Sequence, residues 1–344
     1  MTPAAGSPPP GARSPVRVSA VIVTYNSAHC VGACLTSIVE QLQPHEIIVV
    51  DNASTDATID AVHRAAPSSI VIESSSNLGF GRACNLGVAR ATGDVVAFVN
   101  PDVSISRANL EELDSDLRRA QLGLLVPLLS ATRDARPRHQ IFPYLPWRWV
   151  LLRQTWSHFI PRELKRPARP ARSTAEAWAA AALLFVRKGE FVELGGFDSR
   201  YFLYGEDLDL SRRYRSSGLA VHLTASVVGH HSGAASSTSD DSLRIDPLGW
   251  SLLGTLEYLS HWNGDRVAAR GAAMVLFNFR VERRLLGGMN RIPKLGRVAR
   301  KLRQIERLEA FLLDHARAPD PGVSGHCRGA RVALRTALGY RLET

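Results

Sequence analysis

The sequence has no long uninterrupted hydrophobic run. Its longest uncharged apolar stretch, 177–186, is about half of the ~20 residues that a helix needs to cross a bilayer. The first 15 residues are rich in Pro, Gly, Ala and Ser and lack the apolar core of a secretory signal. We therefore expect a disordered leader over 1–15 and a chain that can lie on a membrane but does not cross one.

Cysteine is scarce, and none of the four cysteines forms a Cys-x-x-Cys pair. They are Cys30, Cys34, Cys84 and Cys327. This spacing predicts neither a disulfide scaffold nor a zinc site, and it favours a reduced, cytosolic compartment.

The loops that mark two large nucleotide-binding classes are also missing. Gly79-Phe80-Gly81 precedes a helical pattern, but the dinucleotide-binding fingerprint follows the first strand, where this chain has Thr24-Tyr25-Asn26-Ser27. No G-x-x-x-x-G-K-[ST] loop occurs. These absences argue against an NAD-dependent enzyme and against a P-loop enzyme.

Positive charge, in contrast, is present in excess. Lys and Arg number 42 against 32 Asp and Glu, so the formal net charge is +10. The physical options for an anionic partner are nucleic acid, an anionic membrane surface and a phosphorylated substrate.

The first hundred residues alternate between apolar runs and helical patterns. Strands are expected over 16–23, 46–50, 70–73 and 95–99, with helices over 28–41 and 57–66 and another that runs through Gly87 and Ala91. This order, with short connections, predicts a parallel sheet with helices on both faces.

Polar residues follow each of these strands, and parallel strands open on one edge of a sheet. The turns are Tyr25-Asn26, Asp51-Asn52, Gly79-Phe80-Gly81-Arg82 and Asn100-Pro101-Asp102. Each alone could be a helix cap or a turn. Together they predict a nucleotide site, in which Asp51 accepts from a ribose or a base imide and Arg82 meets a base carbonyl or a phosphate.

Several separated motifs carry a family resemblance over about 18–236. They are Val21-Ile22-Val23-Thr24-Tyr25-Asn26, Val50-Asp51-Asn52-Ala53-Ser54-Thr55-Asp56, Asn77-Leu78-Gly79-Phe80, Asn85-Leu86-Gly87, Asn100-Pro101-Asp102 and Gly195-Gly196-Phe197-Asp198-x-x-Tyr201-Phe202-x-x-x-Glu206-Asp207-x-Asp209-Leu210. The chain resembles family 2 glycosyltransferases of GT-A fold, in particular their rhamnosyltransferase-like branch.

The resemblance implies roles for individual residues on the donor side. Asp51 would read the nucleoside, and Asp102 would supply the metal-binding carboxylate of the family's D-x-D motif, whose first Asp is here Asn100. His230 is expected beside the metal, with His231 as the weaker candidate. The implied nucleotide-sugar site comprises Thr24, Tyr25, Asn26, Asp51, Asn52, Asn77, Gly79, Arg82 and Asn100, and the implied cofactor is Mg²⁺ or Mn²⁺.

Three acidic residues follow an aromatic-rich stretch on the side that the resemblance assigns to the acceptor. The acids are Glu206, Asp207 and Asp209, and the aromatic residues are Phe197, Tyr201, Phe202 and Tyr204. If a helix starts near Gly205, its dipole alone could explain Glu206 and Asp207 in the first turn. The alternative is catalytic: aromatic walls that raise a carboxylate pKa toward a general base, for which we favour Asp207 over Glu206. Asp209, deeper in the helix, is expected to pair with Arg212 or Arg213.

Two regions depart from this pattern. The segment 132–172 is rich in Pro, Arg and aromatic residues, and is either a surface loop or a flap that touches lipid headgroups. Amphipathic helices are expected over 248–262, 266–286 and 295–315, with many Arg beside apolar stripes. They could present a solvated face, an anionic-membrane surface or, with no recognition motif, a nucleic-acid surface.

The sequence thus predicts a leader (1–15), a GT-A domain (16–239) with a Rossmann-like, mostly parallel sheet, and a basic helical region (240–344). The expected activity is inverting glycosyl transfer without nucleic acid as a partner. L-rhamnose from dTDP-L-rhamnose would pass to a polyprenyl-diphosphate-linked saccharide or another cell-envelope glycan, at the cytoplasmic face of the plasma membrane. A UDP-sugar is the alternative donor, because uracil and thymine offer Asp51 the same imide edge. A basic protein that binds nucleic acid or membrane surfaces is the alternative class.

Overall fold

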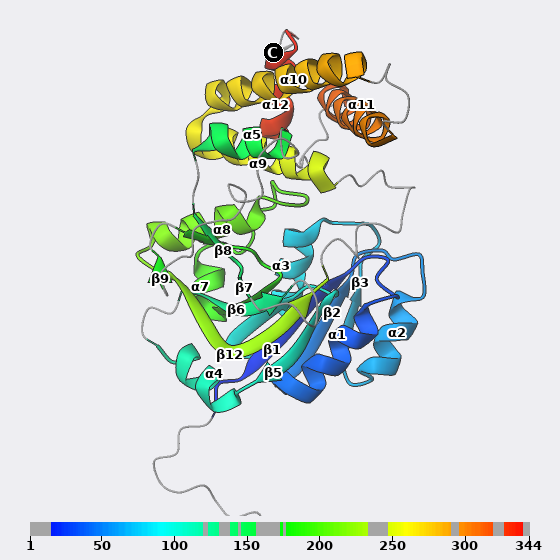
Figure 1. Ribbon diagram of the computed structural model, residues 1–344. Coiled ribbons are helices and arrows are strands. Elements are labelled where there is room, and N and C mark those ends of the chain that lie inside the picture. Colours follow the sequence, from blue (N-terminus) through cyan, green and yellow to red (C-terminus); the bar gives the residue numbers. More distant parts are fainter. Residues whose placement is uncertain are drawn as a thin grey trace, which may run out of the picture.

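The computed structural model describes residues 15–119, 123–130, 138–143, 146–155, 173–174, 177–232, 247–289, 296–318 and 327–339. Figure 1 shows two stacked parts, an α/β domain built on a large sheet and a helical region above it. Most of the expected leader and much of 132–172 lie outside the described residues.

Four parallel strands form one half of the sheet, in the order β3-β2-β1-β4. They are β1 (Val18–Thr24), β2 (Glu46–Asp51), β3 (Ile70–Glu73) and β4 (Val95–Val99). Thr24 pairs with Asp51 across β1 and β2, and Ile22 pairs with Val99 across β1 and β4. The turns after these strands therefore lie level with one another, as the sequence predicted.

Helices cover both faces of these strands because alternate residues of β1 point to opposite sides. The helices are α1 (Val31–Ser37), which continues as a π-helical segment (Ile38–Leu42), α2 (Thr58–Ala65) and α3 (Phe80–Arg90). Ile22 lies in one hydrophobic cluster with Leu35 and Val62, whereas Val21 lies in the other with Val88. Each face of the sheet thus has its own core.

The other half of the sheet is mixed. Its strands are β5 (Val103–Ala108), β6 (Leu124–Ser130), β11 (Leu183–Arg187) and the long β12 (Val221–His231), with short β7 (Arg138–His139) and β9 (Ser173–Thr174) at its margins. β11 runs antiparallel to β4 and β6, and β12 runs parallel to β6 and antiparallel to β5. A separate ribbon pairs β8 (Ile141–Pro143) with β10 (Ala177–Ala179).

Three further helices belong to the α/β domain: α4 (Leu110–Leu117), α7 (Lys188–Glu193) and α8 (Glu206–Ser216). Helix α8 starts at the acidic pair, as expected. Its N-cap, Gly205, has φ 94°, a left-handed conformation that favours glycine.

The helical region comprises α5 (Trp147–Thr155), α9 (Pro247–Asn263), α10 (Asp265–Met289), α11 (Gly296–Arg317) and α12 (Arg328–Ala337). The three helices expected from the sequence are present, and α12 is an addition. Helix α5 lies within the segment expected as a loop or flap. It is stabilised as part of the helical region, since its buried Leu151 packs in the same cluster as Leu256 and Val275. Among the described helices, none combines the length and apolar character needed to cross a membrane.

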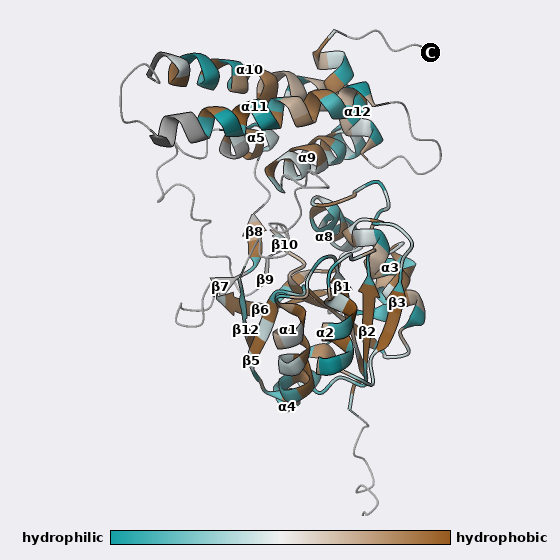
Figure 2. Cartoon of the chain, turned by 90° about the vertical axis from the view of Figure 1, so that its right-hand side faces the viewer, coloured by the Kyte–Doolittle hydropathy of each residue, from teal (hydrophilic) through white to brown (hydrophobic). Residues whose placement is uncertain are grey.

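Figure 2, turned by 90°, shows the same arrangement, with α9 on the side of the helical region that faces the α/β domain and α10 on the side away from it. Helix α9 contacts the domain below through Gly254, and the start of α12 adds a hydrogen bond from Cys327 to Arg200. Those contacts fall beside the edge where the parallel strands end.

Candidate active site

A cavity of about 270 Å³ opens where β1, β2 and β4 end. Its floor comes from the turns after these strands, and its opposite wall from Ala180–Ala182 and the segment that leads into α8. Eight of the predicted site residues line it: Tyr25, Asn52, Asn77, Gly79, Asn100, Asp102, Glu206 and Asp207. Donor-side and acceptor-side motifs about 100 residues apart thus meet in one space, as convergence at a sheet edge predicts.

Asn52 ties the donor-side turns together. Its amide nitrogen donates to Asn77 Oδ1 at 2.8 Å, and its Oδ1 accepts from the Leu78 backbone N–H at 2.7 Å. Gly79 follows with φ 82°, and a Cβ there would lie 2.3 Å from the Phe202 carbonyl oxygen. Only glycine fits at this junction between the two sides of the cavity.

Thr24, Asn26 and Asp51 do not line the cavity but shape its floor. The Asp51 carboxylate is buried and accepts from the Thr24 hydroxyl at 2.8 Å and from the Ser54 hydroxyl at 2.6 Å. Asn26 Oδ1 accepts from the Thr55 backbone N–H at 2.8 Å. In this structure these polar groups hold the turns after β1 and β2 in register, and the nucleoside-reading role of Asp51 remains a prediction.

Arg82 lies on α3, partly exposed and outside the cavity lining. Its expected contact with a base or phosphate also remains a prediction.

Asp102 brings a buried carboxylate to the cavity. Its side chain is 1% exposed, and neither carboxylate oxygen accepts a hydrogen bond from any described group. His231 Nε2 lies 3.2 Å from Oδ1. A buried carboxylate without donors is costly in an apolar setting, whereas a hard divalent cation prefers such oxygen ligands. Asp102 therefore fits a cation site, to which a nucleotide diphosphate could add further oxygens.

The structure brings His231 rather than His230 to Asp102. Both end strand β12, not a loop, and consecutive strand residues point to opposite faces. His231 lines the cavity, while His230 does not. Sequence alone could not choose between them, because the alternation depends on a register shift between Val228 and Gly229 relative to β5.

The two acids at the start of α8 have raised pKa values. Burial, followed by the charge of Asp207, raises the pKa of Glu206 to about 8. Burial also raises the pKa of Asp207, to about 6, against the opposing effect of hydrogen bonds from the backbone amides of Leu208 and Ala181. Burial thus makes both carboxyl groups more basic than free ones, which suits a general base within this pair.

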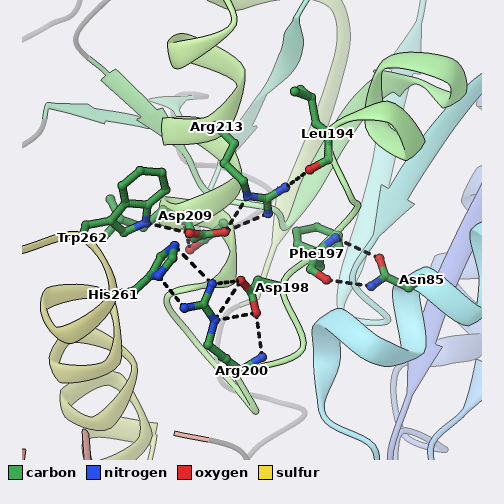
Figure 3. A network of polar contacts seen from close by, with 11 residues as sticks. Asn85, Leu194, Phe197, Asp198, Arg200, Asp209, Arg213, His261 and Trp262 are labelled. Carbon is green, nitrogen blue, oxygen red and sulfur yellow. Dashed lines mark hydrogen bonds and ion pairs between the residues drawn. The ribbon is translucent and has the colours of Figure 1, made fainter. Parts of the chain in front are cut away.

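Asp209 belongs to a different network, drawn in Figure 3. Its buried carboxylate accepts from Arg213 Nε and from Trp262 Nε1, each at 2.8 Å. This confirms the expected pairing with Arg213. Arg200 joins Asp198 to His261 in the same network.

The ligand atoms of Asp198, Asp209 and His261 lie within 4.8 Å of one another, as a metal site would require. However, the guanidinium groups of Arg200 and Arg213 already supply the positive charge there. We therefore interpret this network as a structural ion-pair cluster between α8, its preceding loop and α9.

The aromatic residues before α8 fall into two groups, one in the core and one at the cavity. Phe197 and Tyr201 are 1% and 0% exposed and pack inside the domain, whereas Phe202 and Tyr204 line the cavity. Ala180–Ala182 also line it, with small methyl side chains.

A parallel sheet edge that gathers polar turns against an acidic helix start agrees with the resemblance to GT-A glycosyltransferases. Residues 19–142 match the family model of glycosyl transferase family 2, so the chain is a glycosyltransferase with a family 2 domain.

Two curated relatives span most of the chain. It is 28% identical over 288 residues to the N-acetylglucosaminyl-diphospho-decaprenol L-rhamnosyltransferase of Mycobacterium tuberculosis, covering 70% of this chain and 91% of that protein. It is 25% identical over 266 residues to rhamnosyltransferase WbbL of Escherichia coli, covering 72% and 97%. A solved structure of a Pyrobaculum calidifontis mannosyltransferase aligns with a TM-score of 0.48 at 19% identity, covering 91% and 90%.

Proposed function

We propose that the protein transfers L-rhamnose from dTDP-L-rhamnose, with inversion, to a polyprenyl-diphosphate-linked saccharide. The observation that carries this proposal is the cavity itself, which holds a carboxylate without hydrogen-bond donors, Asp102, on the donor side and a carboxylate of raised pKa, Asp207, on the acceptor side. The names of the Mycobacterium tuberculosis and Escherichia coli relatives support rhamnose as the sugar, and the former supports a lipid-linked acceptor. A UDP-sugar remains the second candidate donor.

The reaction would be a single displacement. Asp207 accepts the proton of the acceptor hydroxyl as the oxygen attacks the anomeric carbon, and the nucleoside diphosphate leaves on the opposite side. The raised pKa of Glu206 favours its protonated form, which limits the negative charge beside that base. Phe202 and Tyr204 wall the attacking side and exclude water from it.

Asp102, with His231 beside it, would hold Mg²⁺ or Mn²⁺. When bound, the cation supplies positive charge that stabilises the departing diphosphate. The polar turns after β1 and β2 would orient the nucleotide.

A donor panel tests the proposal. Thermal unfolding is followed with dTDP-rhamnose, dTDP-glucose, UDP-glucose, UDP-N-acetylglucosamine and GDP-mannose, each with and without Mg²⁺, and transfer is then measured to a synthetic lipid-diphosphate-linked N-acetylglucosamine. We expect the largest stabilisation and the transfer with dTDP-rhamnose. Stabilisation and transfer only with a UDP-sugar would move the donor assignment, and no response to any donor would refute it.

We further propose that the exposed face of α10 docks on the anionic cytoplasmic surface of the plasma membrane. One stripe of this helix carries exposed Arg266, Arg270, Phe277, Arg280 and Arg284, and Phe277 is 63% exposed. Among the described residues of α10 after Asp265, no acidic side chain is exposed. Basic side chains around an apolar anchor suit anionic headgroups.

Co-sedimentation with vesicles of anionic and of zwitterionic lipid tests this docking. Arg270→Gln with Arg280→Gln should weaken binding to anionic vesicles by about 30-fold, from ~1 kcal/mol per arginine. Arg64→Gln with Arg90→Gln removes the same charge from exposed positions of α2 and α3 and should change binding little. Equal losses in the two double variants would refute a localised surface, and tighter binding to duplex DNA than to anionic vesicles would favour the nucleic-acid alternative.

A further inference from the structure

The segment Tyr201–Gly205, here called the acceptor-side loop, is held in an unusual backbone conformation. Tyr204 has φ 65° and Gly205 has φ 94°, so two consecutive residues are left-handed just before the acidic pair. A bulky residue with positive φ costs free energy and persists only where its surroundings impose it. Contacts with the rest of the protein must therefore stabilise the left-handed conformation of this loop.

Helix α9 touches the loop backbone directly. A Cβ on Gly254 would lie 2.1 Å from the Tyr204 carbonyl oxygen, and a Cβ on Gly205 would lie 3.0 Å from the Gly254 carbonyl oxygen. Any side chain at position 254 would push the loop away. Helix and loop are thus in backbone-to-backbone contact at the two left-handed residues.

One helical turn earlier, α9 contributes an aromatic contact. The ring of Trp250 stacks on Phe202 with centroids 4.6 Å apart and planes inclined by 35°. Phe311 of α11 also packs against Trp250, edge to face, with ring centroids 5.5 Å apart. Phe202 lines the cavity, so Trp250 lies directly behind the acceptor-side wall.

The loop is anchored at two more places. The Phe80 backbone N–H donates to the Phe202 carbonyl oxygen at 2.9 Å, which fixes the loop to the donor side. The Cys327 N–H, at the start of α12, donates to the Arg200 carbonyl oxygen at 2.7 Å. The loop is therefore clamped between the donor-side turns and the helical region.

We propose that Trp250 is a positioning residue for the acceptor: its stack on Phe202 sets the cavity wall against which the acceptor saccharide binds. The inference rests on the proposed function. It assigns the helical region a part in acceptor binding, although no described residue of that region lines the cavity. The ring contacts of Trp250 are to Phe202, Phe311 and His315, so its removal should act on acceptor binding more than on donor binding.

The test compares Trp250→Leu and Trp250→Phe in the full chain. KM is measured for dTDP-rhamnose and for the synthetic lipid-diphosphate-linked N-acetylglucosamine, together with the fraction of donor that is hydrolysed instead of transferred. Trp250→Leu should raise the acceptor KM by about threefold to tenfold, the range expected from losing one aromatic pair, and should increase hydrolysis. Trp250→Phe retains a ring and should recover most of the loss, while the donor KM stays within about twofold in both.

Phe202→Leu probes the same pair from the loop. If the stack carries the effect, Trp250→Leu added to Phe202→Leu should raise the acceptor KM no further than Phe202→Leu alone, because Phe202→Leu already removes the ring on which Trp250 acts. This cycle also covers the case in which Trp250→Leu fails to fold, since Phe202→Leu must then reproduce the acceptor effect by itself.

Gly254→Ala gives a second, backbone test, matched by Gly287→Ala on α10, where an added Cβ meets nothing within 4 Å. The acceptor KM should rise in the first variant and stay unchanged in the second. Equal changes in the donor and acceptor KM, or no change in either, would overturn the proposal while wild-type transfer still upheld the proposed function. No transfer by the wild type to this acceptor, despite donor stabilisation, would instead refute the acceptor assignment on which both rest.

Discussion

The donor and acceptor sides of the cavity are built in different ways. The donor side is built from one stretch of the chain: Asp51 bonds to Thr24 at the end of β1, and Asn52 bonds to Asn77 and Leu78 in the turn after β3. The acceptor-side loop instead depends on α9 and on the start of α12, two helices of the separate helical region. A site can thus have one half encoded in short motifs and the other half in tertiary packing.

The largest expected effect comes from Asp102, the donor-side carboxylate. Asp102→Asn should lower turnover by about 10³ because the charge that would hold a divalent cation is lost. The free energy of unfolding should not fall, since a buried and uncompensated charge is removed. Turnover with Mg²⁺ and thermal unfolding without it are measured together.

Asp60→Asn, at an exposed position of α2, is the control for Asp102→Asn and should behave as wild type. Full activity of the wild type in EDTA, or of Asp102→Asn with Mg²⁺, would remove the cation from the mechanism.

On the acceptor side, Asp207→Asn should lower turnover by about 10² or more, the scale of general-base loss, while donor affinity survives. Asparagine keeps the shape and removes the basicity. Stabilisation by dTDP-rhamnose against thermal unfolding measures donor binding, and transfer measures turnover. Near-normal turnover here, with collapse in Glu206→Gln, would move the base to Glu206.

Asp209 separates packing from chemistry. Asp209→Asn leaves the Arg213 guanidinium beside a neutral amide and weakens the contact to Trp262, so the free energy of unfolding should fall by about 3 kcal/mol. Turnover of the folded fraction should change only a few-fold. Chemical denaturation and transfer assays below the unfolding transition provide both values.

Asp198→Asn is a comparison within the same network, because its carboxylate pairs with the more exposed Arg200 and should cost less stability than Asp209→Asn. A loss of turnover in Asp209→Asn as large as that in Asp207→Asn would contradict the structural assignment.

The smallest effect on turnover is expected from Glu206→Gln, whose signature is pH dependence. Asp207 must be ionised to act, so kcat/KM should fall as pH drops through about 6, in the variant as in the wild type. Glu206 has a folded-state pKa of about 8, above its ordinary value of 4.5, so the unfolded chain releases this proton first and stability should decline as pH rises between these values. Glu206→Gln should flatten that decline in a denaturation series from pH 5 to 8. An unchanged slope would mean that another group titrates.

The sequence predicted that the turns after β1, β2 and β4 lie together, because the determinants of this convergence are local. Asn100-Pro101-Asp102 follows a short apolar run, and the alternation of strands and helices is enough to bring that turn level with Thr24 and Asp51. The hydrogen-bond partners of the buried Asp51 carboxylate could not be predicted, because they depend on how the neighbouring turns close around it.

What the sequence could not show depends on contacts between distant segments. The choice of His231 over His230 follows from the pairing of β12 with β5, for which no motif exists. The sequence around Trp250 predicts an apolar position on an amphipathic helix and nothing more. Helix α5 lies in a Pro-rich stretch and could not be predicted, because the residues that pack against its Leu151 lie on α9 and α10. The hydrophobic period and the composition of a segment predict neither the register of a strand nor the element that packs against a helix.

The close approach of Gly254 to the Tyr204 carbonyl has a consequence for protein engineering. A chimera that joined this α/β domain to the helices of a relative at a boundary near residue 240 would part the loop from the helix that fits it. The exchangeable module comprises the acceptor-side loop and α9 together, two segments separated in the chain but matched at the level of single backbone atoms. Redesign of acceptor preference should therefore exchange positions 201–205 and 250–254 together.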